Sequence, residues 1–270
     1  MNILIVGGGR MGEAFAKSLL KSGFSDISVA EPDIVRKNYL INSLNIRTSN
    51  KDSINEQLKE LVPDSDILII CVKPQIFSSL SELLSPHLNE KVIIISILAG
   101  INLTKICKLL GVKNAIRVMP NTPSQIGKGV SVWTSKESLS EKIESEVTKI
   151  LDCLGISIKT SNESDLDRAT AISGSGPGYI FLIMEILENV AIEIGLSKKV
   201  SRKLILETFQ GSTELAKITK KDFKELREEV TSPNGTTEAG IREMKKNKFD
   251  FAIKFGIIKA YKRSIEISDD

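Results

Sequence analysis

The sequence is poor in the residues that most metal sites and nucleophilic triads require. Its 270 residues include one histidine, His87, and three cysteines, Cys71, Cys107 and Cys153, with no C-x-x-C pair. This argues against a conventional zinc site, and we expect no bound metal. A Ser-His-Asp triad would depend on His87, whose surroundings do not resemble a nucleophile elbow. The cysteines have apolar neighbours, which predicts small buried side chains in a reducing compartment.

The sequence also lacks a strong net charge and a long apolar run. Its 37 basic and 34 acidic residues leave a formal charge of +3, too balanced to indicate a nucleic-acid partner. No uninterrupted apolar run has the length of a membrane span. The N-terminal stretch MNILIVGGGR has neither the basic region nor the cleavage site of a signal peptide. We therefore expect a cytoplasmic protein that does not bind membranes.

Near its start the sequence has a glycine-rich turn between a predicted strand and a predicted helix. Residues 2–23 read as a short apolar strand, the turn GGGRMG, and an amphipathic helix. The turn fits G-x-G-x-x-G with Gly7, Gly9 and Gly12, between the strand and helix that a dinucleotide fingerprint requires. Gly7 would make the tight turn, Gly9 would let the backbone approach a pyrophosphate, and Gly12 would let helix and strand pack closely. The alternative is a plain strand-to-helix turn.

The second strand ends in an acidic residue at the spacing expected for ribose recognition. Glu31 follows the glycine turn where a carboxylate would accept hydrogen bonds from the adenosine ribose, which favours NADH. Arg36 and Lys37 follow closely and would suit the 2′-phosphate of NADPH. The sequence therefore leaves NADH and NADPH open while favouring NADH.

Further apolar strands at 66–72, 91–98 and 114–119 alternate with helical patterns. This order predicts an α/β, Rossmann-type, doubly wound parallel sheet, which ligands approach at the carboxyl ends of the strands. A strand, a helix and a strand then close a dinucleotide-binding domain over residues 1–160. The residues that we expect to bind the cofactor are Gly7, Gly8, Gly9, Arg10, Met11, Gly12, Glu31, Asn50, Cys71, Val72, Lys73, Pro74, Ala99, Gly100 and Asn121.

Residues 161–270 show only helical patterns, which predicts an all-α second domain. Its first long helix, from about Pro177 to Ile194, is apolar on several faces, so we expect burial against a second copy of the chain. Two glycine-bearing loops interrupt this half, SGSGPG at 173–178 and SPNGTTEAG at 232–240. The second would present free N–H groups and two threonines at a helix start, which suits a carboxylate. Simple capping by Thr236 or Thr237 is the alternative.

Five motifs together resemble the pyrroline-5-carboxylate reductase family. They are GGGRMG, VKP, RVMPNTP, SGSGPGY and TSPNGTTEAG, in this order, and the resemblance runs over essentially the whole chain. It implies an NAD(P)H-dependent oxidoreductase that reduces a small cyclic imine carrying one carboxylate, in the last step of proline biosynthesis. It also implies a dimer through the helical domain, with decamers common in the family.

The resemblance implies roles for particular residues of the helical half. Thr237 would hydrogen-bond the ring nitrogen, either donating a proton or holding an iminium that is already protonated. The backbone around Asn234 would hold the substrate carboxylate. The residues implied to bind substrate are Glu163, Val230, Ser232, Asn234, Gly235, Thr236, Thr237 and Met119. Asn234 and Gly178 depart from the family's common glycine and alanine, and Glu31 departs from the small residue of NADP-using members.

Two other functions fit parts of the pattern. One is another imine or β-hydroxyacid reductase of the same layout, but those enzymes usually depend on a lysine where this loop offers threonines. The other is a non-catalytic NAD(P)-binding redox sensor, against which the intact glycine turn and Thr237 both argue.

Overall fold

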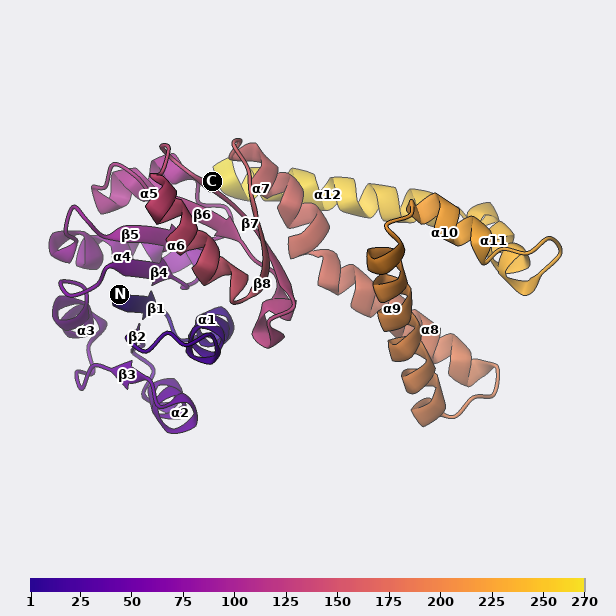
Figure 1. Ribbon diagram of the computed structural model, residues 1–270, viewed down its shortest axis with the longest axis horizontal. Helices are drawn as coiled ribbons and strands as arrows, with labels where there is room; N and C mark the ends of the chain where they lie inside the picture. Colours follow the sequence, from indigo (N-terminus) through magenta and orange to yellow (C-terminus); the bar gives the residue numbers. More distant parts are fainter. Residues whose placement is uncertain (270) are drawn as a thin grey trace. The chain divides into compact units, whose positions relative to one another are not determined.

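The computed structural model describes residues 1–269, which form two compact units (Figure 1). The first comprises residues 1–175 together with the C-terminal turns from Ala260, and the second comprises Gly176–Lys259. The sheet ends at Lys159, close to the expected end of the first domain, whereas the compact units divide after Ser175. The domain division at residue 160 stays a prediction.

The first unit is built on one eight-stranded sheet of order β3-β2-β1-β4-β5-β6-β7-β8. All pairs are parallel except β6 with β7, which is antiparallel. The Rossmann-type doubly wound sheet predicted from the sequence is confirmed, and its one antiparallel pair arises because only a short 3₁₀ turn, Thr122–Ile126, joins the two strands. The strands are β1 (Ile3–Val6), β2 (Ile27–Ala30), β3 (Arg47–Thr48), β4 (Ile67–Ile70), β5 (Ile93–Ser96), β6 (Ile116–Met119), β7 (Gly129–Ser135) and β8 (Gly155–Lys159).

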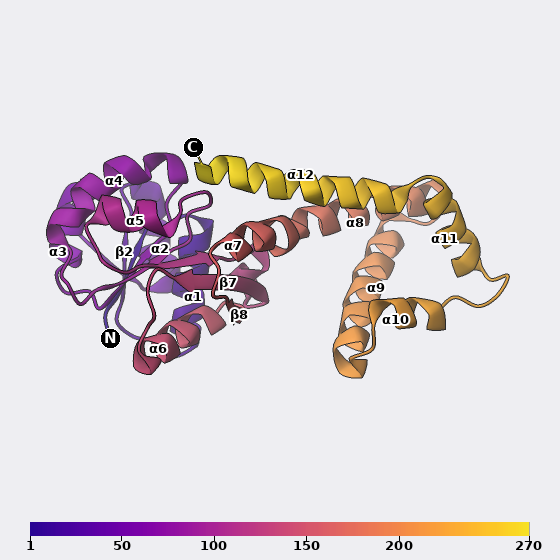
Figure 2. The same ribbon diagram turned by 90° about the horizontal axis from the view of Figure 1, so that it is seen from above.

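Helices cover both faces of this sheet (Figure 2). Alternate residues of β1 point to opposite faces: Ile3 and Ile5 belong to one apolar core, Leu4 and Val6 to the other. The first core is closed by α1 (Arg10–Lys21), α2 (Ile34–Leu44) and α6 (Glu141–Asp152). The second is closed by α3 (Ile54–Leu61), α4 (Phe77–Leu84) and α5 (Leu103–Leu110). Burial on both faces explains why the central strands are continuously apolar.

The last turns of α12 (Phe249–Asp269) complete the first unit. Gly100 has a φ of +72°, and a Cβ there would lie 2.2 Å from Cγ2 of Ile267. The hydroxyls of Ser264 and Ser268 both donate to Asp167 Oδ1, at 2.9 and 3.2 Å. Asp167 lies on α7 (Ser164–Ala169), which a π-helical turn, Thr170–Gly174, extends.

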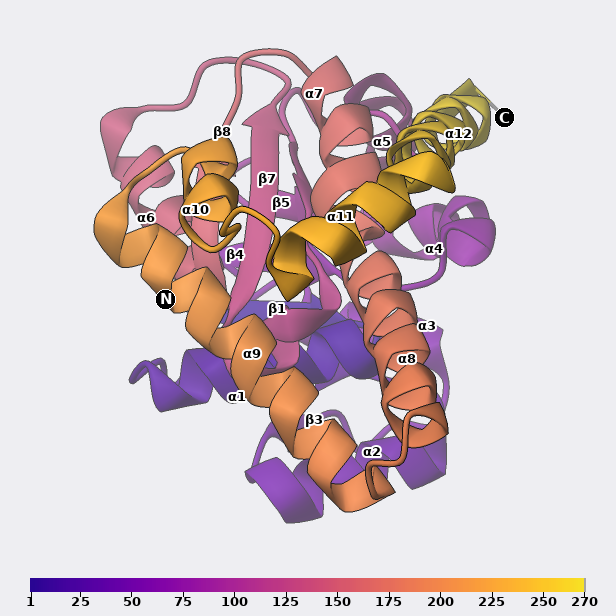
Figure 3. The same ribbon diagram turned by 90° about the vertical axis from the view of Figure 1, so that its right-hand side faces the viewer.

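The second unit is entirely helical, with α8 (Gly176–Glu193), α9 (Lys198–Thr219), α10 (Phe223–Glu229), α11 (Thr236–Lys246) and the start of α12 (Figure 3). Pro177 lies in the first turn of α8, as predicted. Among the described residues, every buried hydrophobic side chain occurs at or before Ala171. The second unit instead exposes many large apolar side chains, including Ile180, Phe181, Leu182, Ile186, Val190, Phe251 and Phe255. In a single copy of the chain, the second unit therefore has no apolar core of its own.

One helical run, Ser164–Glu193, is long and apolar enough to cross a bilayer by length and composition alone. Glu185, Glu188 and Glu193 interrupt its apolar sequence. Length and composition are weak evidence for a span, since helices that pack against other protein segments pass the same test.

Candidate functional site

A pocket of about 340 Å³ lies at the carboxyl ends of β1, β2 and β4 in the first unit. Parallel strands with helices on both faces bind ligands at this edge. The pocket brings together six of the residues expected to bind the cofactor: Gly7, Gly9, Glu31, Cys71, Val72 and Lys73. Apolar side chains line the rest of it, namely Val6, Ala30, Pro32, Ile54, Ile76, Leu80 and Leu83, with Ser79.

The glycines of the turn differ in what surrounds them. Gly7 has a φ of +100°, and a Cβ there would lie 2.8 Å from the Cys71 carbonyl oxygen. A Cβ on Gly12 would lie 1.9 Å from the Gly7 carbonyl oxygen, so α1 and β1 need a glycine there. A Cβ on Gly9 would meet no protein atom within 4 Å, and Gly9 is the N-cap of α1 without a side-chain cap. The open space at this helix N-terminus fits a pyrophosphate.

Backbone N–H groups hold the Glu31 side chain against the glycine turn. Its Oε2 accepts from the Gly8 N–H at 2.8 Å, and its Oε1 accepts from the Asp33 N–H at 2.9 Å. Buried Gln57 fixes the Glu31 backbone, accepting from its N–H and donating to its carbonyl. The Glu31 carboxylate is therefore fixed in position on the pocket wall.

Several other predicted cofactor residues lie outside this pocket. Arg10 and Met11 form the first turn of α1, Asn50 is exposed after β3, and Pro74 begins a 3₁₀ turn, Pro74–Ile76. Ala99 is exposed after β5, whereas Gly100 is buried beneath Ile267. The Asn121 amide accepts from the Val130 N–H and donates to the Ser173 carbonyl, which ties the RVMPNTP loop to the SGSGPG turn. Their cofactor roles stay predictions.

The three cysteines are free thiols of intermediate burial. Burial raises the pKa of Cys71, Cys107 and Cys153 above that of an ordinary thiol. They are thus protonated near neutral pH and are poor nucleophiles.

Glu163, expected to contact substrate, is part of a charge network in the first unit. Its Oε1 accepts from the Leu103 N–H at 2.7 Å and from Arg117 Nη1 at 3.0 Å. Arg117 lies on β6 with 1% of its surface exposed, and its Nη2 lies 3.5 Å from Asp167 Oδ1. The buried arginine therefore links β6 to α7 and, through Asp167, to the last turns of α12. The substrate role of Glu163 stays a prediction.

Arg117→Met is expected to lower the free energy of unfolding by about 2 kcal/mol, because two carboxylates lose their buried counter-ion. The Glu163 side chain is 30% exposed and can be partly rehydrated, so the loss should be smaller than for a fully buried pair. Urea denaturation measures it, with Arg117→Lys as the control that keeps a charge. Unchanged stability in Arg117→Met would show that the network contributes nothing net.

The TSPNGTTEAG loop leads into α11 in the second unit. Asn234 has a φ of +58°, a left-handed backbone that asparagine tolerates, so the turn survives the departure from the family's common glycine. Gly235 is the helix N-cap and has no side-chain cap, so capping does not explain the two threonines. Thr236 and Thr237 are exposed, and their hydroxyls bond to no residue that the structure describes. Glu238 Oε2 accepts from the Asn234 N–H at 2.7 Å, which fixes the turn.

The other residues expected to bind substrate lie in both units. In the second unit, Val230 is 60% exposed at the end of α10, and Ser232 is exposed with its carbonyl accepting from the Gly235 N–H. In the first, Met119 is 7% exposed at the end of β6, and its thioether packs beside Gly174. These roles also stay predictions.

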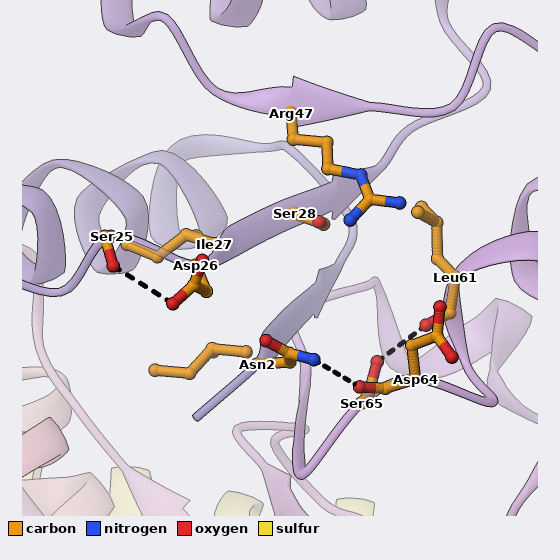
Figure 4. A pocket seen from close by; sticks show the side chains of 10 residues that line it. Asn2, Ser25, Asp26, Ile27, Ser28, Arg47, Leu61, Asp64 and Ser65 are labelled. Carbon is orange, nitrogen blue, oxygen red and sulfur yellow. Dashed lines mark hydrogen bonds between the residues drawn. The ribbon is translucent and has the colours of Figure 1, made fainter.

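A smaller pocket of about 100 Å³ lies at the opposite edge of the sheet (Figure 4). Its lining includes Asn2, Asp26 and Ser28, at the amino ends of β1 and β2, and the Arg47 side chain. Ligands of doubly wound sheets bind at the carboxyl ends, so this pocket is not the cofactor site.

Known proteins resemble this chain over its full length. Pyrroline-5-carboxylate reductase of Pseudomonas aeruginosa is 30% identical over 270 residues, covering 99% of this chain and 97% of that protein. The chain belongs to the pyrroline-5-carboxylate reductase family. The enzyme of the same name from Synechocystis sp. is 33% identical, with 97% of each chain covered. A family model described as pyrroline-5-carboxylate reductase dimerisation matches residues 163–267, and one described as NADP oxidoreductase coenzyme F420-dependent matches residues 2–100.

Solved structures of family members have the same fold. A pyrroline-5-carboxylate reductase from Coxiella burnetii is 29% identical with a TM-score of 0.89, covering 99% of this chain and 98% of that one. The Plasmodium falciparum pyrroline carboxylate reductase, crystallised with NADP bound, is 28% identical with a TM-score of 0.83 over the same shares. As a member of the pyrroline-5-carboxylate reductase family, the chain is an NAD(P)H-dependent oxidoreductase acting on a CH–NH bond, and its glycine turn and pocket fit that cofactor.

Three polar residues that support this part of the fold are not among those predicted from the sequence. Gln57 and Glu13 resemble the polar residues of any amphipathic helix, so the sequence gives no local sign of their contacts with Glu31 and with Arg36 on α2. Arg117 can be noticed in the sequence, because a cation in the middle of the apolar strand AIRVM requires a buried counter-ion.

Proposed function

We propose that this protein reduces 1-pyrroline-5-carboxylate to L-proline with NADH as the preferred donor. The observation that carries the proposal is the start of α11, where an uncapped helix N-terminus lies beside the unbonded hydroxyl of Thr237. Free N–H groups at a helix N-terminus stabilise a carboxylate, and an adjacent hydroxyl suits an imine nitrogen.

Each group has a distinct part in the reaction. The N–H groups of Thr236 and Thr237 hold the substrate carboxylate and so orient the ring, because those of Asn234 and Gly235 already donate to Glu238 and to the Ser232 carbonyl. The Thr237 hydroxyl hydrogen-bonds the ring nitrogen, which needs one proton for the hydride that the carbon accepts. The hydroxyl either relays a solvent proton to a neutral imine or accepts a hydrogen bond from an iminium that already carries this proton. The nicotinamide cofactor supplies a hydride to the carbon of the C=N bond. The protein contributes mainly orientation and electrostatics, and this step uses no metal.

The preference for NADH rests on the carboxylate on the pocket wall. Glu31 is fixed beside the glycine turn, where it suits ribose hydroxyls and repels a phosphate. Of the two cations considered from sequence, Lys37 is buried and donates to the Lys51 carbonyl at 3.0 Å. Arg36 is paired with Glu13. The Plasmodium falciparum family member has been crystallised with NADP bound, so NADPH is the alternative donor that the test must include.

We also propose that the protein is a cytoplasmic homodimer formed through its helical unit. The many uncovered apolar side chains of that unit support this, since a second copy would remove them from water. The same reasoning assigns the apolar run Ser164–Glu193 to a protein interface rather than a bilayer. Assembly beyond the dimer, into a decamer, stays a prediction.

The reaction is tested by following oxidation of NADH and NADPH separately, with 1-pyrroline-5-carboxylate as substrate. We expect proline to form and kcat/KM to be about tenfold higher with NADH, the factor that corresponds to about 1.4 kcal/mol. Absence of proline with both cofactors would contradict the proposed reaction and favour the redox-sensor alternative. A preference for NADPH would contradict only the role of Glu31.

A further inference from the structure

Arg36 is held in one position by contacts on several sides. Its backbone N–H donates to Asp33 Oδ1 at 2.7 Å, in the first turn of α2. Its guanidinium donates to the Gly8 carbonyl through Nε, and through Nη2 to the Gly9 carbonyl at 3.3 Å and to Glu13. The guanidinium carbon also lies 4.9 Å from the centre of the Tyr39 ring. The arginine therefore lies on the outer side of the glycine turn.

Glu13 is the acceptor that fixes this arrangement. Its carboxylate accepts hydrogen bonds from Lys17, Arg36 and Tyr39. Burial alone would raise the pKa of Glu13, but these hydrogen bonds outweigh it and lower the pKa to about 2. Glu13 is therefore ionised across the working range of the enzyme and competes for Arg36 with any incoming anion.

We propose that Glu13 determines cofactor preference by retaining the Arg36 guanidinium, which would otherwise be available to a phosphate ester on the adenosine ribose. This inference rests on the proposed preference for NADH. Glu13 is a positioning residue: it acts through Arg36 and leaves Glu31 to meet the ribose. Specificity of this kind comes from withholding a favourable contact from the wrong ligand.

The charges around the turn support the same conclusion. They comprise three carboxylates, Glu13, Glu31 and Asp33, and three cations, Arg36, Lys17 and Arg10 of the turn itself. With Glu13 ionised, this set is balanced, and without the Glu13 charge it would be net positive, which would favour a phosphate dianion. Replacing Glu13 with a neutral amide of the same shape removes one negative charge and leaves Arg36 without its ion pair.

The test is the dissociation constant of each cofactor, measured without substrate from the change in nicotinamide fluorescence on binding. We expect Glu13→Gln to tighten NADPH binding about tenfold and to change NADH binding less than twofold, consistent with one released arginine–phosphate contact. The double variant Glu13→Gln with Arg36→Gln should lose this gain. Lys17→Gln is the matched control, because it removes another partner of Glu13 and leaves Arg36 paired.

A second variant keeps the inference testable if Glu13→Gln fails to fold. In Arg36→Gln the ratio of the NADPH to the NADH dissociation constant should stay within about threefold of the wild-type ratio, because Arg36 is engaged elsewhere. A tenfold rise in that ratio would mean that Arg36 already binds the phosphate, which overturns the proposal. Equal tightening of both cofactors in Glu13→Gln would also overturn it. Wild-type protein that binds NADH but makes no proline would contradict the proposed reaction and leave this test intact.

Discussion

Gly9→Val is expected to fold like the wild type and to lose at least about 100-fold in affinity for NADH and NADPH. Gly9 has φ and ψ of −63° and −168°, a conformation that residues other than glycine adopt, and a Cβ there meets no protein atom within 4 Å. The added side chain would instead occupy the space at the start of α1 where a pyrophosphate approaches the backbone. Fluorescence titration measures the affinity, and thermal unfolding tests the fold.

Gly12→Ala is the informative contrast to Gly9→Val. Its new Cβ would lie 1.9 Å from the Gly7 carbonyl oxygen, so α1 must shift away from β1 and the protein should unfold at a lower temperature. The two variants thus separate a glycine required by the ligand from one required by the fold. Tight cofactor binding by Gly9→Val would show that the pyrophosphate does not lie at this turn.

Thr237→Ala is expected to lower kcat by about 100-fold while leaving the dissociation constant of NADH within twofold of wild type. Loss of a positioned proton donor or hydrogen-bond donor in a transition state has effects of this order. The hydroxyl is exposed at the start of α11 and caps nothing, so the fold should not suffer. Steady-state kinetics with saturating NADH measures kcat, and proline formation identifies the product.

Two further variants make the result for Thr237 specific. Thr237→Ser keeps the hydroxyl and should retain most of the activity. Thr213→Ala removes an exposed threonine hydroxyl from α9, outside the substrate loop, and should leave kcat unchanged. If Thr237→Ala turns over as fast as wild type, the hydroxyl is not the group that meets the ring nitrogen.

The strands and the glycine turn could be predicted because their causes are local. The runs ILIV and ILII are apolar at every position, and all of these residues are buried between two layers of helices. The two-residue strand β3 has no such run, since Arg47 and Thr48 are polar. The antiparallel direction of β7 could not be predicted, because parallel and antiparallel strands have the same apolar sequence pattern.

Residue roles that depend on distant contacts could not be predicted. Gly100 resembles any glycine at a strand end, and only the fold reveals that Ile267 lies against it. Glu31 lies in the pocket because it follows the end of β2, which could be read from the sequence, and its cofactor role stays a prediction. Its link to Gln57 depends on the packing of α3. The left-handed turn at Asn234 has a local cause instead, because asparagine itself tolerates that backbone.

The contact between Gly100 and Ile267 has a consequence for synthesis on the ribosome. The first unit is discontinuous: its sheet is complete at Lys159, but the helical turns that cover Gly100 and bind Asp167 are translated about a hundred residues later. Because translation adds about 5–20 residues per second, this surface of the nascent unit stays uncovered for several seconds. The turns that finish the first unit are therefore synthesised only after the whole helical unit.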